Sequence, residues 1–345
     1  MARKLKWHHR LRIERLAQAR QFETLDGVLH KLASKGFDVA GVPFQLLDMA
    51  LSEGGASDHR EMLPLARHTV GGQPQLLSAA LQDLHAGRPE LLSQLASDRD
   101  VHPMTRFEAA GWACYVAHRD VLPASGRQVT DVFQFWDSDT PPDEVIAGRA
   151  DWRRVSGSHQ WFSEADAEGY IRDGFGADAA RGFARLWHPA VKSDLFRLYR
   201  LAQDGGLYCD ADSKPRPEIA AFLAAGGGRV WASSMTNVPN CVVNNWFVAA
   251  PPKSPFIEAL LTEVLANLAN PGERGIFWLT GPGAYTGFLH GNIGAYDVGL
   301  LPSGLLKGRY FKQLDADYKL TSQNWRVYEH ALGIDNDEGL ARALG

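Results

Sequence analysis

Two aspartates separated by one residue, Asp210 and Asp212, are the strongest candidates for chemistry in this sequence of 345 residues. They close a run of aromatic and apolar residues, Gly206–Asp212, whose composition predicts a strand. Side chains alternate along a strand, so Tyr208 and both aspartates are expected to point to one side. Two carboxylates together suit a hard divalent cation, Mg²⁺ or Mn²⁺, which completes its shell with phosphate oxygens and water. The alternative for so short a motif is a pair of solvated loop aspartates.

A second charged pair, Asp194 and Arg197, precedes these aspartates on a predicted helix over residues 189–204. The i, i+3 spacing places both side chains on one helix face, where they can address a common target. Gly205 and Gly206 predict the end of the helix, because glycine adopts the left-handed conformation without a Cβ clash. An ion pair on the helix surface with Lys192 or Arg200 is the alternative.

Both pairs belong to one long spaced pattern, S-D-x-x-R-x-x-x-L-x-x-x-G-G-x-Y-x-D-x-D, which runs from Ser193 to Asp212. This pattern resembles the sugar-binding region of family 32 glycosyltransferases, which include fungal outer-chain mannosyltransferases and bacterial capsular polysaccharide enzymes and are related to glucosylating toxins. Three flanking segments are similar to the same family, namely Phe133–Trp136 before a proline loop, Asn244–Pro251 and Thr280–Pro282. The resemblance covers residues 129–290, with weaker similarity to about residue 328, and leaves the first 120 residues outside it.

The resemblance implies an α/β nucleotide-sugar-binding domain of the Rossmann-like GT-A type, with ligands at the carboxyl ends of the strands. It implies that Asp212 binds Mn²⁺ or Mg²⁺ directly, and that Asp210 contacts the metal through water or holds the ribose. The metal would neutralise the departing diphosphate. Such enzymes often carry a histidine-rich stretch before a Ser-Trp pair, whereas residues 321–325 here read Thr-Ser-Gln-Asn-Trp. Asn324 is the residue of this stretch expected to offer an oxygen to the metal.

The same resemblance implies the substrate-binding residues, each of which has a structural alternative. Trp136 is expected to hold the nucleotide base, or else to be a core tryptophan under the first strand. Asp194 is assigned to the donor-sugar hydroxyls and Arg197 to the diphosphate. Tyr208 is expected to line the donor pocket, with a half-buried strand tyrosine as the alternative. The pair Asn244–Asn245 is expected to orient the sugar or the acceptor, or else to cap a loop.

The patterning divides the chain into an all-helical N-terminal region, residues 1–125, and an α/β GT-A domain, residues 126–345. Apolar residues recur at helical spacing over residues 25–32, 77–84 and 91–95. After a break that contains proline and glycine, β-branched and aromatic runs alternate with helical patterns, which indicates an α/β sheet. Strands are expected at residues 129–136, 206–212, 229–233, 241–249 and 298–301, and helices at 164–173, 177–187, 189–204 and 255–268.

The composition excludes several classes of protein. Lys and Arg number 36 against 40 Asp and Glu, and the formal charge of −4 offers no broad basic face for nucleic acid. The three cysteines, Cys114, Cys209 and Cys241, are widely spaced without a CxxC pair, so neither a disulfide scaffold nor a zinc ribbon is expected. No run of about 18 apolar residues occurs, so no membrane span is expected. A cytoplasmic protein is the expectation.

The N-terminal region begins with basic residues that suit peripheral contact with anionic lipid on the cytoplasmic membrane face. A solvated chain end is the alternative reading of this cluster, which consists of Lys4, Lys6, Arg10, Arg12 and Arg15. The rest of the helical region is a candidate for oligomerisation or acceptor recognition.

The family resemblance implies a metal-dependent retaining glycosyltransferase that moves a sugar from a UDP- or GDP-sugar to a glycan, lipid-linked or protein acceptor. Front-face attack, with the leaving phosphate as base, is the expected route to retention. A catalytically inactive nucleotide-sugar-binding module is the alternative, and the missing histidine near Trp325 favours it. A metal-dependent phosphohydrolase built on Asp210 and Asp212 is a third hypothesis, which lacks further acidic motifs at suitable strand ends.

Overall fold

The computed structural model describes residues 5–18, 21–37, 39, 90–101, 103–118, 120, 122–123, 125–138, 140–235, 242–314, 321 and 324–334. The described part of residues 1–125 contains four helices, α1 (Trp7–Gln18), α2 (Phe22–Ser34), α5 (Glu90–Ser97) and α6 (Pro103–His118). The described part of this region contains no strand. The helix predicted around residues 77–84 lies outside the described residues.

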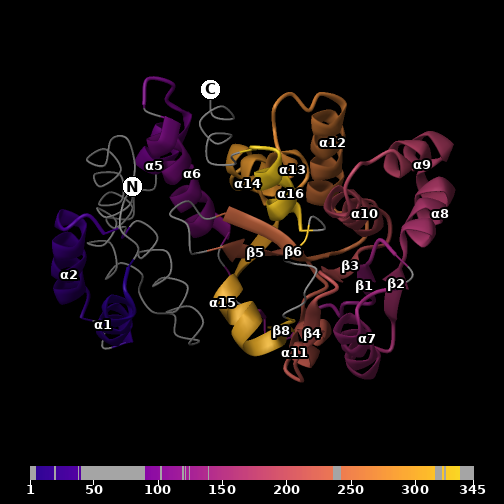
Figure 1. Cartoon of the computed structure of the whole chain (residues 1–345), viewed down its shortest axis with the longest axis horizontal. Helices are drawn as coiled ribbons and strands as arrows, with labels where there is room; N and C mark the ends of the chain where they lie inside the picture. Colours follow the sequence, from indigo (N-terminus) through magenta and orange to yellow (C-terminus); the bar gives the residue numbers. More distant parts are fainter. Residues whose placement is uncertain are drawn as a thin grey trace.

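A six-stranded mixed sheet forms the centre of the rest of the chain (Figure 1). Its strand order is β2 (His159–Phe162), β1 (Val132–Phe135), β3 (Gly206–Cys209), β6 (Val242–Ala250), β5 (Val230–Met235) and β7 (Val298–Pro302). Strand β6 is antiparallel to both of its neighbours, and the other pairings are parallel. Strands β4 (Ser213–Pro215) and β8 (Phe311–Gln313) form a separate antiparallel pair. The predicted mixed α/β architecture is therefore confirmed.

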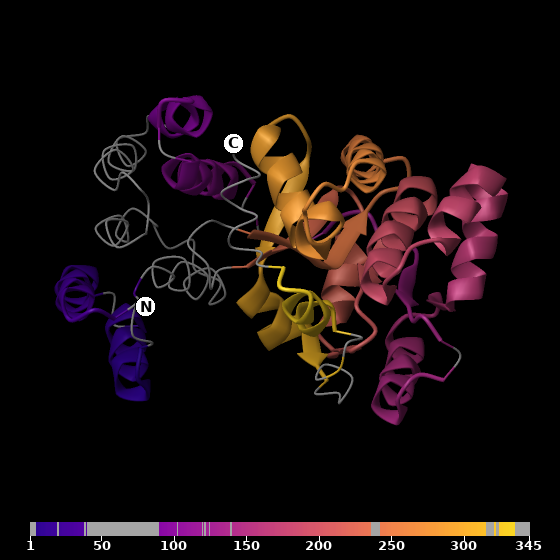
Figure 2. The ribbon, with the colours of Figure 1, turned by 45° about the horizontal axis from the view of Figure 1, so that its top comes forward.

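Helices cover both faces of the sheet because alternate strand residues are apolar on each side (Figures 1 and 2). Phe133 and Phe135 of β1 join a cluster with α8 (Glu164–Phe175), α9 (Ala177–Ala184), α10 (Pro189–Asp204), α12 (Pro255–Ala269) and α14 (Pro282–Gly291). Val132 joins the opposite cluster, with α7 (Asp143–Val155), α11 (Ile219–Ala225) and the π-helix η2 (Leu306–Tyr310), which follows the short α15 (Ser303–Leu305). The short helices α13 (Ile276–Leu279) and α16 (Trp325–Ala331) complete the described fold.

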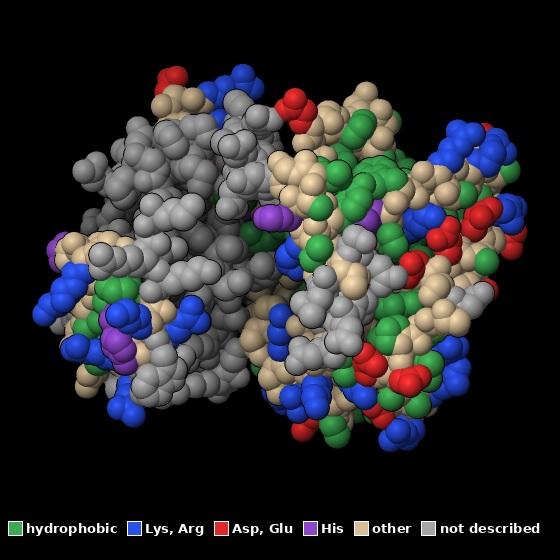
Figure 3. All heavy atoms as spheres, in the orientation of Figure 1, with side chains coloured by type: hydrophobic (Ala, Val, Ile, Leu, Met, Phe, Trp, Pro, Cys, Tyr) green, Lys and Arg blue, Asp and Glu red, His purple; other side chains and the backbone are tan. Residues whose placement is uncertain are grey.

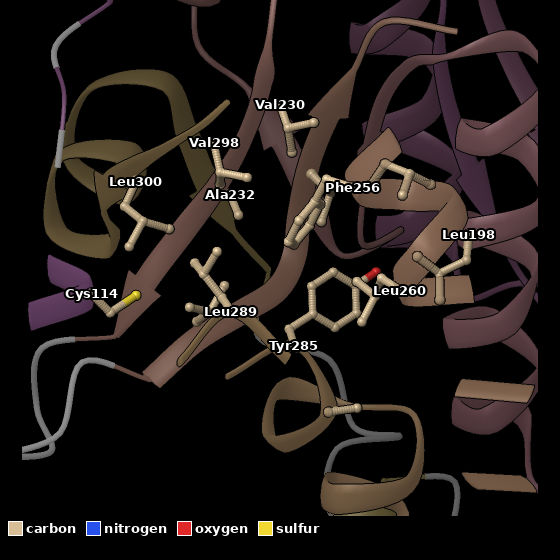
Figure 4. Packing of buried hydrophobic residues seen from close by; sticks show 14 of the residues in the cluster. Cys114, Leu198, Val230, Ala232, Phe256, Leu260, Tyr285, Leu289, Val298 and Leu300 are labelled. Atoms are coloured by element: carbon tan, nitrogen blue, oxygen red, sulfur yellow. The ribbon is translucent and has the colours of Figure 1, made fainter. Parts of the chain in front are cut away.

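Helix α6 packs directly on the α/β unit although it precedes the predicted domain boundary. Its Cys114 and Tyr115 are buried in the same cluster as β7 and α14, and Figure 4 shows Cys114 beside Leu300. The buried His118 ring lies 3.1 Å from the Val298 carbonyl oxygen through Nδ1 and accepts the Gly294 N–H at Nε2, 3.2 Å away. The last helix of residues 1–125 thus contributes to the core of the sheet.

The five predicted strands and four predicted helices after residue 126 are all present, with bounds that differ by a few residues. Strands β2, β4 and β8 were not predicted, because they are three or four residues long and rich in polar residues. Among the described residues, no helix combines the length and apolar character needed to cross a bilayer.

Candidate functional site

A cavity of 370 Å³ opens at the carboxyl ends of β1 and β3, where open α/β sheets place their ligands. It is also lined by the first half of α10, the start of β6, α13, η2 and α16. All nine residues predicted for the site line this one cavity: Trp136, Asp194, Arg197, Tyr208, Asp210, Asp212, Asn244, Asn245 and Asn324. Their shared position is a structural finding, whereas their individual roles in binding stay predictions.

The two aspartates lie in a turn and not at the end of a strand, which corrects the predicted span of residues 206–212. Strand β3 ends at Cys209, and the Ser213 N–H donates to the Asp210 carbonyl oxygen at 2.9 Å to close the turn. The Asp210 N–H donates to the Trp246 carbonyl oxygen (2.9 Å), and the Leu314 N–H donates to that of Asp212 (2.8 Å). The turn is thus held by β6 and by Leu314, the residue after β8. It presents both carboxylates to the cavity, although the alternation of side chains along β3 ends at Cys209.

Asp194 and Arg197 form a buried ion pair, so the alternative of a helix-surface pair is wrong. Their side chains are 8% and 4% exposed, and the Arg197 Nη2 lies 2.9 Å from the Asp194 Oδ1. Two further donors reach this carboxylate at 2.8 Å, the Asn245 amide and the Thr280 hydroxyl. Burial raises the pKa of Asp194, and Arg197, Thr280 and Asn245 oppose that rise. The Thr-Gly-Pro segment identified in the sequence therefore contributes its threonine to this cluster.

A chain of hydrogen bonds links Arg197 to Asp210. The Arg197 Nη2 donates to the Ser193 Oγ (3.0 Å), which lies 2.8 Å from the Tyr208 hydroxyl, and that hydroxyl donates to the Asp210 Oδ1 (3.0 Å). The guanidinium also lies over the Tyr208 ring, 4.2 Å from its centre. Tyr208 is fully buried, not half-buried as the alternative for it supposed.

The Arg197 guanidinium is largely committed to protein acceptors. Besides Asp194 and the Ser193 hydroxyl, it donates to the carbonyl oxygens of Asn245 and Ser193. Although burial opposes it, the nearby Tyr208 and acidic groups raise the pKa of Arg197 above its ordinary value. The residue is a permanent buried cation that organises Asp194, Tyr208 and Asp210 around itself.

Asp210 has an unusually high proton affinity for a carboxyl group that faces a cavity. Burial in the cavity wall raises its pKa to about 6, with further upward pressure from Asp212 and Asp194, while Arg197 opposes the rise. The side chain is still 40% exposed to the cavity, so its charge is accessible to a ligand. Since the negative charges of Asp212 and Asp194 help to keep Asp210 protonated, a bound cation would offset them and favour the ionised form of Asp210.

The donor set fits a metal that takes few protein ligands. Within the described ranges, no cluster of three or more His, Cys, Asp and Glu side chains is placed to hold a metal ion. Asp210 and Asp212 supply two carboxylates at the cavity wall, a donor set suited to Mg²⁺ or Mn²⁺ that keeps water and phosphate oxygens as its other ligands. Asn324 also lines the cavity, but its Oδ1 accepts the Arg326 N–H (3.1 Å) as the N-cap of α16.

The remaining predicted residues differ in what they touch. Trp136 is partly buried at one wall of the cavity, where it packs against the small cluster of Val145, Ala211 and Leu314, and it is not a fully buried core residue. The Asn244 Oδ1 accepts the Trp246 N–H at 3.3 Å, which is a local turn-like contact. Asn245 is buried and donates to Asp194, so it orients that carboxylate.

Sequence reasoning missed the far wall of the cavity. Lys307 of η2 and Arg326 of α16 add two cations to the lining, and the Arg326 guanidinium lies 4.4 Å from the Trp325 ring centre. Trp325 packs against Phe277 of α13 at 5.9 Å. The buried Glu329 of α16 accepts the Ile276 N–H, which fixes this wall. No sequence signal marked Lys307, whereas Arg326 directly follows the noted tryptophan.

A family model matches part of this chain. Residues 126–226 match the family model described as "Glycosyltransferase sugar-binding region containing DXD motif". The chain is also similar to a solved structure titled "PaToxG Glycosyltransferase", with 16% sequence identity and a TM-score of 0.34 over 68% of this chain and 87% of that chain. No curated protein matches the chain. The α/β unit therefore contains a glycosyltransferase-like sugar-binding region, and the matched range includes the predicted pair Asp210 and Asp212.

Proposed function

We propose that the chain is a metal-dependent retaining glycosyltransferase of family 32, which moves a sugar from a UDP- or GDP-sugar to a hydroxyl group of a glycan, lipid-linked or protein acceptor. The observation that carries the proposal is the single cavity lined by Asp210 and Asp212 together with the buried Asp194–Arg197 pair. The matched sugar-binding region supports the same reaction class.

Asp212 and Asp210 hold the divalent cation, and Asn324 contributes the remaining lone pair of its Oδ1 or a contact through water. When bound, the cation supplies electrostatic neutralisation of the departing diphosphate. Lys307 and Arg326 face the same cavity and take the diphosphate charge that the cation leaves unbalanced. They are better suited to this contact than Arg197, because most of the Arg197 N–H groups already have acceptors within the protein.

Trp136 and Asp194 bind the two ends of the donor. The partly buried Trp136 ring offers a flat apolar surface for the nucleotide base. Asp194 lines the cavity with both oxygens held in place by neighbouring donors, and it accepts hydrogen bonds from sugar hydroxyls through its remaining lone pairs. Asn245 and Thr280 act indirectly, by fixing that carboxylate, and Asn244 borders the acceptor side.

Retention follows a front-face route in this proposal. Asp194 is a poor covalent nucleophile, because a bond from its carboxylate to carbon would remove the negative charge that the buried Arg197 faces and would weaken the hydrogen bond from Asn245 or from Thr280. The leaving phosphate then accepts the proton of the attacking hydroxyl while the acceptor oxygen bonds to the anomeric carbon on the same face.

The test is incubation of the full chain with a panel of sugar nucleotides and Mn²⁺, followed by NMR of the released sugar. We expect slow hydrolysis of one donor, initial release of the anomer with the donor configuration, and loss of activity in Asp212→Asn. Asp178→Asn, a change of the same type at a side chain 94% exposed on α9, is the matched control and keeps wild-type activity. Donor binding without turnover would identify an inactive module, and phosphate release from simple monoesters would identify a phosphohydrolase.

A cytoplasmic location with peripheral membrane contact is part of the proposal. Beyond the predicted Lys6, Arg10, Arg12 and Arg15, α2 and the residue after it add exposed Lys31 and Lys35. Figure 3 shows Lys and Arg side chains grouped at the end of the molecule where α1 and α2 lie. Lys4 lies outside the described residues. In liposome pelleting, removal of residues 1–20 is expected to reduce binding to anionic vesicles, and equal binding would refute the contact.

A further inference from the structure

Gln134 is a buried amide in an otherwise apolar layer. It follows Val132 by two residues on β1, and its side chain is fully buried. The same layer holds Val132, Trp152, Leu207 and Cys209 in a hydrophobic cluster. A primary amide in such a place is unfavourable unless its donors and acceptors are satisfied. Its hydrogen-bond partners therefore indicate what the residue is for.

The amide bonds to the turn that carries the two aspartates. The Gln134 Nε2 donates to the Asp210 carbonyl oxygen at 3.0 Å and lies 3.5 Å from the Cys209 Sγ. Because the Asp210 carbonyl can only accept, the amide nitrogen must point to the turn and the amide oxygen away from it. The Oε1 lies 3.1 Å from the His159 Nε2, which therefore carries the proton and donates.

His159 links this contact to the other end of the turn. Its ring stacks on Trp152 with centres 6.1 Å apart and an interplanar angle of 12°. The Trp152 Nε1 donates to the Ser213 carbonyl oxygen at 2.8 Å. Burial lowers the pKa of His159 to about 4, so the ring is neutral and its tautomer is set by Gln134. The network thus touches the first and the last residue of the turn Asp210–Ser213.

We propose that Gln134, His159 and Trp152 form a positioning network that sets the direction of the Asp210 and Asp212 carboxylates for cation binding. The inference rests on the proposed function, since it assigns a task to residues behind the D-x-D motif. Gln134, His159 and Trp152 are not among the described residues that line the cavity, so they act through the turn and not on a substrate. Their counterpart on the cavity side is the hydrogen bond from Tyr208 to the Asp210 Oδ1.

The test is Mn²⁺ binding to the full chain, measured by the loss of the free Mn²⁺ signal in electron paramagnetic resonance. Gln134→Met keeps the length of the side chain and removes both hydrogen bonds, and we expect its Mn²⁺ affinity to fall by about 10-fold or more, the usual effect of losing a residue that orients metal ligands. Gln160→Met is the matched control on the adjacent strand β2, whose amide contacts Asp131 at 3.4 Å and lies outside the network. Its affinity is expected to stay within about twofold of wild type.

A second variant separates positioning from general loss of stability. Trp152→Phe keeps the stacked ring and removes only the donor to Ser213, so its Mn²⁺ affinity is expected to fall in the same direction by a smaller factor. Thermal unfolding of all variants is measured without metal. Unchanged Mn²⁺ affinity in Gln134→Met, or an equal loss in Gln160→Met, overturns the positioning network while leaving the proposed function intact. If wild type and Asp212→Asn bind Mn²⁺ equally, both proposals fall.

Discussion

Replacing Arg197 by methionine removes a guanidinium that contacts both Asp194 and Asp210. At the observed 2.9 Å and an effective dielectric constant of about 20, the attraction between Arg197 and Asp194 is about 6 kcal/mol. The net loss is smaller, because Asp194 can take up a proton instead of staying charged. Protonating a carboxyl of ordinary pKa costs about 4 kcal/mol at pH 7 and about 1.5 kcal/mol at pH 5.

We therefore expect Arg197→Met to lower the free energy of unfolding by about 3–5 kcal/mol at pH 7, the range found when one partner of a buried ion pair is lost. The loss should shrink by about 2 kcal/mol at pH 5, where Asp194 is more easily neutralised. The assay is urea unfolding followed by tryptophan fluorescence at both pH values. In the double variant Asp194→Asn/Arg197→Met, no buried carboxylate is left without its cation. Most of the loss in the free energy of unfolding, and its pH dependence, should therefore disappear.

Two results would contradict this reasoning. One is a loss in Arg197→Met that is the same at pH 5 and pH 7, which would mean that the lost packing over Tyr208 dominates. The other is a double variant no more stable than Arg197→Met, which would mean that Asp194 is not left with an uncompensated charge.

Three further outcomes are expected. Because the pKa of Asp210 is raised to about 6, its ionisation destabilises the metal-free fold as the pH rises from about 4 through 6. Asp210→Asn should therefore unfold at a higher temperature than wild type at pH 8 and lose this advantage below pH 4. An equal difference in unfolding temperature at both pH values would exclude the electrostatic cause. EDTA should stop sugar transfer and Mn²⁺ should restore it, whereas activity that persists after dialysis against EDTA would refute metal dependence. Gly205→Ala should lower the free energy of unfolding in urea by at least about 1–3 kcal/mol, because Gly205 has φ 68° and a Cβ would lie 2.5 Å from the Pro252 nitrogen. A urea midpoint equal to that of wild type would show that the turn relaxes.

The sequence predicts the sheet because the patterns of strands and helices are local, whereas the residues expected at the cavity were implied by the resemblance to a known family. Alternating apolar residues fix which side of β1 faces α10, and a helix followed by two glycines and a strand places Asp194, Arg197 and the D-x-D motif near one another. The presentation of Asp210 and Asp212 could not be predicted from alternation, because contacts from Leu314 and Trp246, distant in sequence, turn the chain after Cys209.

The burial of the Asp194–Arg197 pair could not be predicted from the sequence either. An i, i+3 pair is compatible with a helix surface, and only the packing of β6 and α13 over α10 supplies Asn245 and Thr280 as donors. Lys307 was missed for the same reason, since a π-helix has no distinctive residue pattern and its place in the cavity depends on the whole fold.

The docking of α6 sets a practical limit on how the α/β unit can be isolated. A fragment that starts at residue 126, where the family match begins, would lack Cys114 and Tyr115 and would uncover Leu289 and Leu300 to water. Exposed leucines of this kind promote association between copies and reduce solubility. The smallest fragment that keeps the sheet covered therefore begins ahead of Pro103, well before the part of the chain that is similar to other sugar-binding regions.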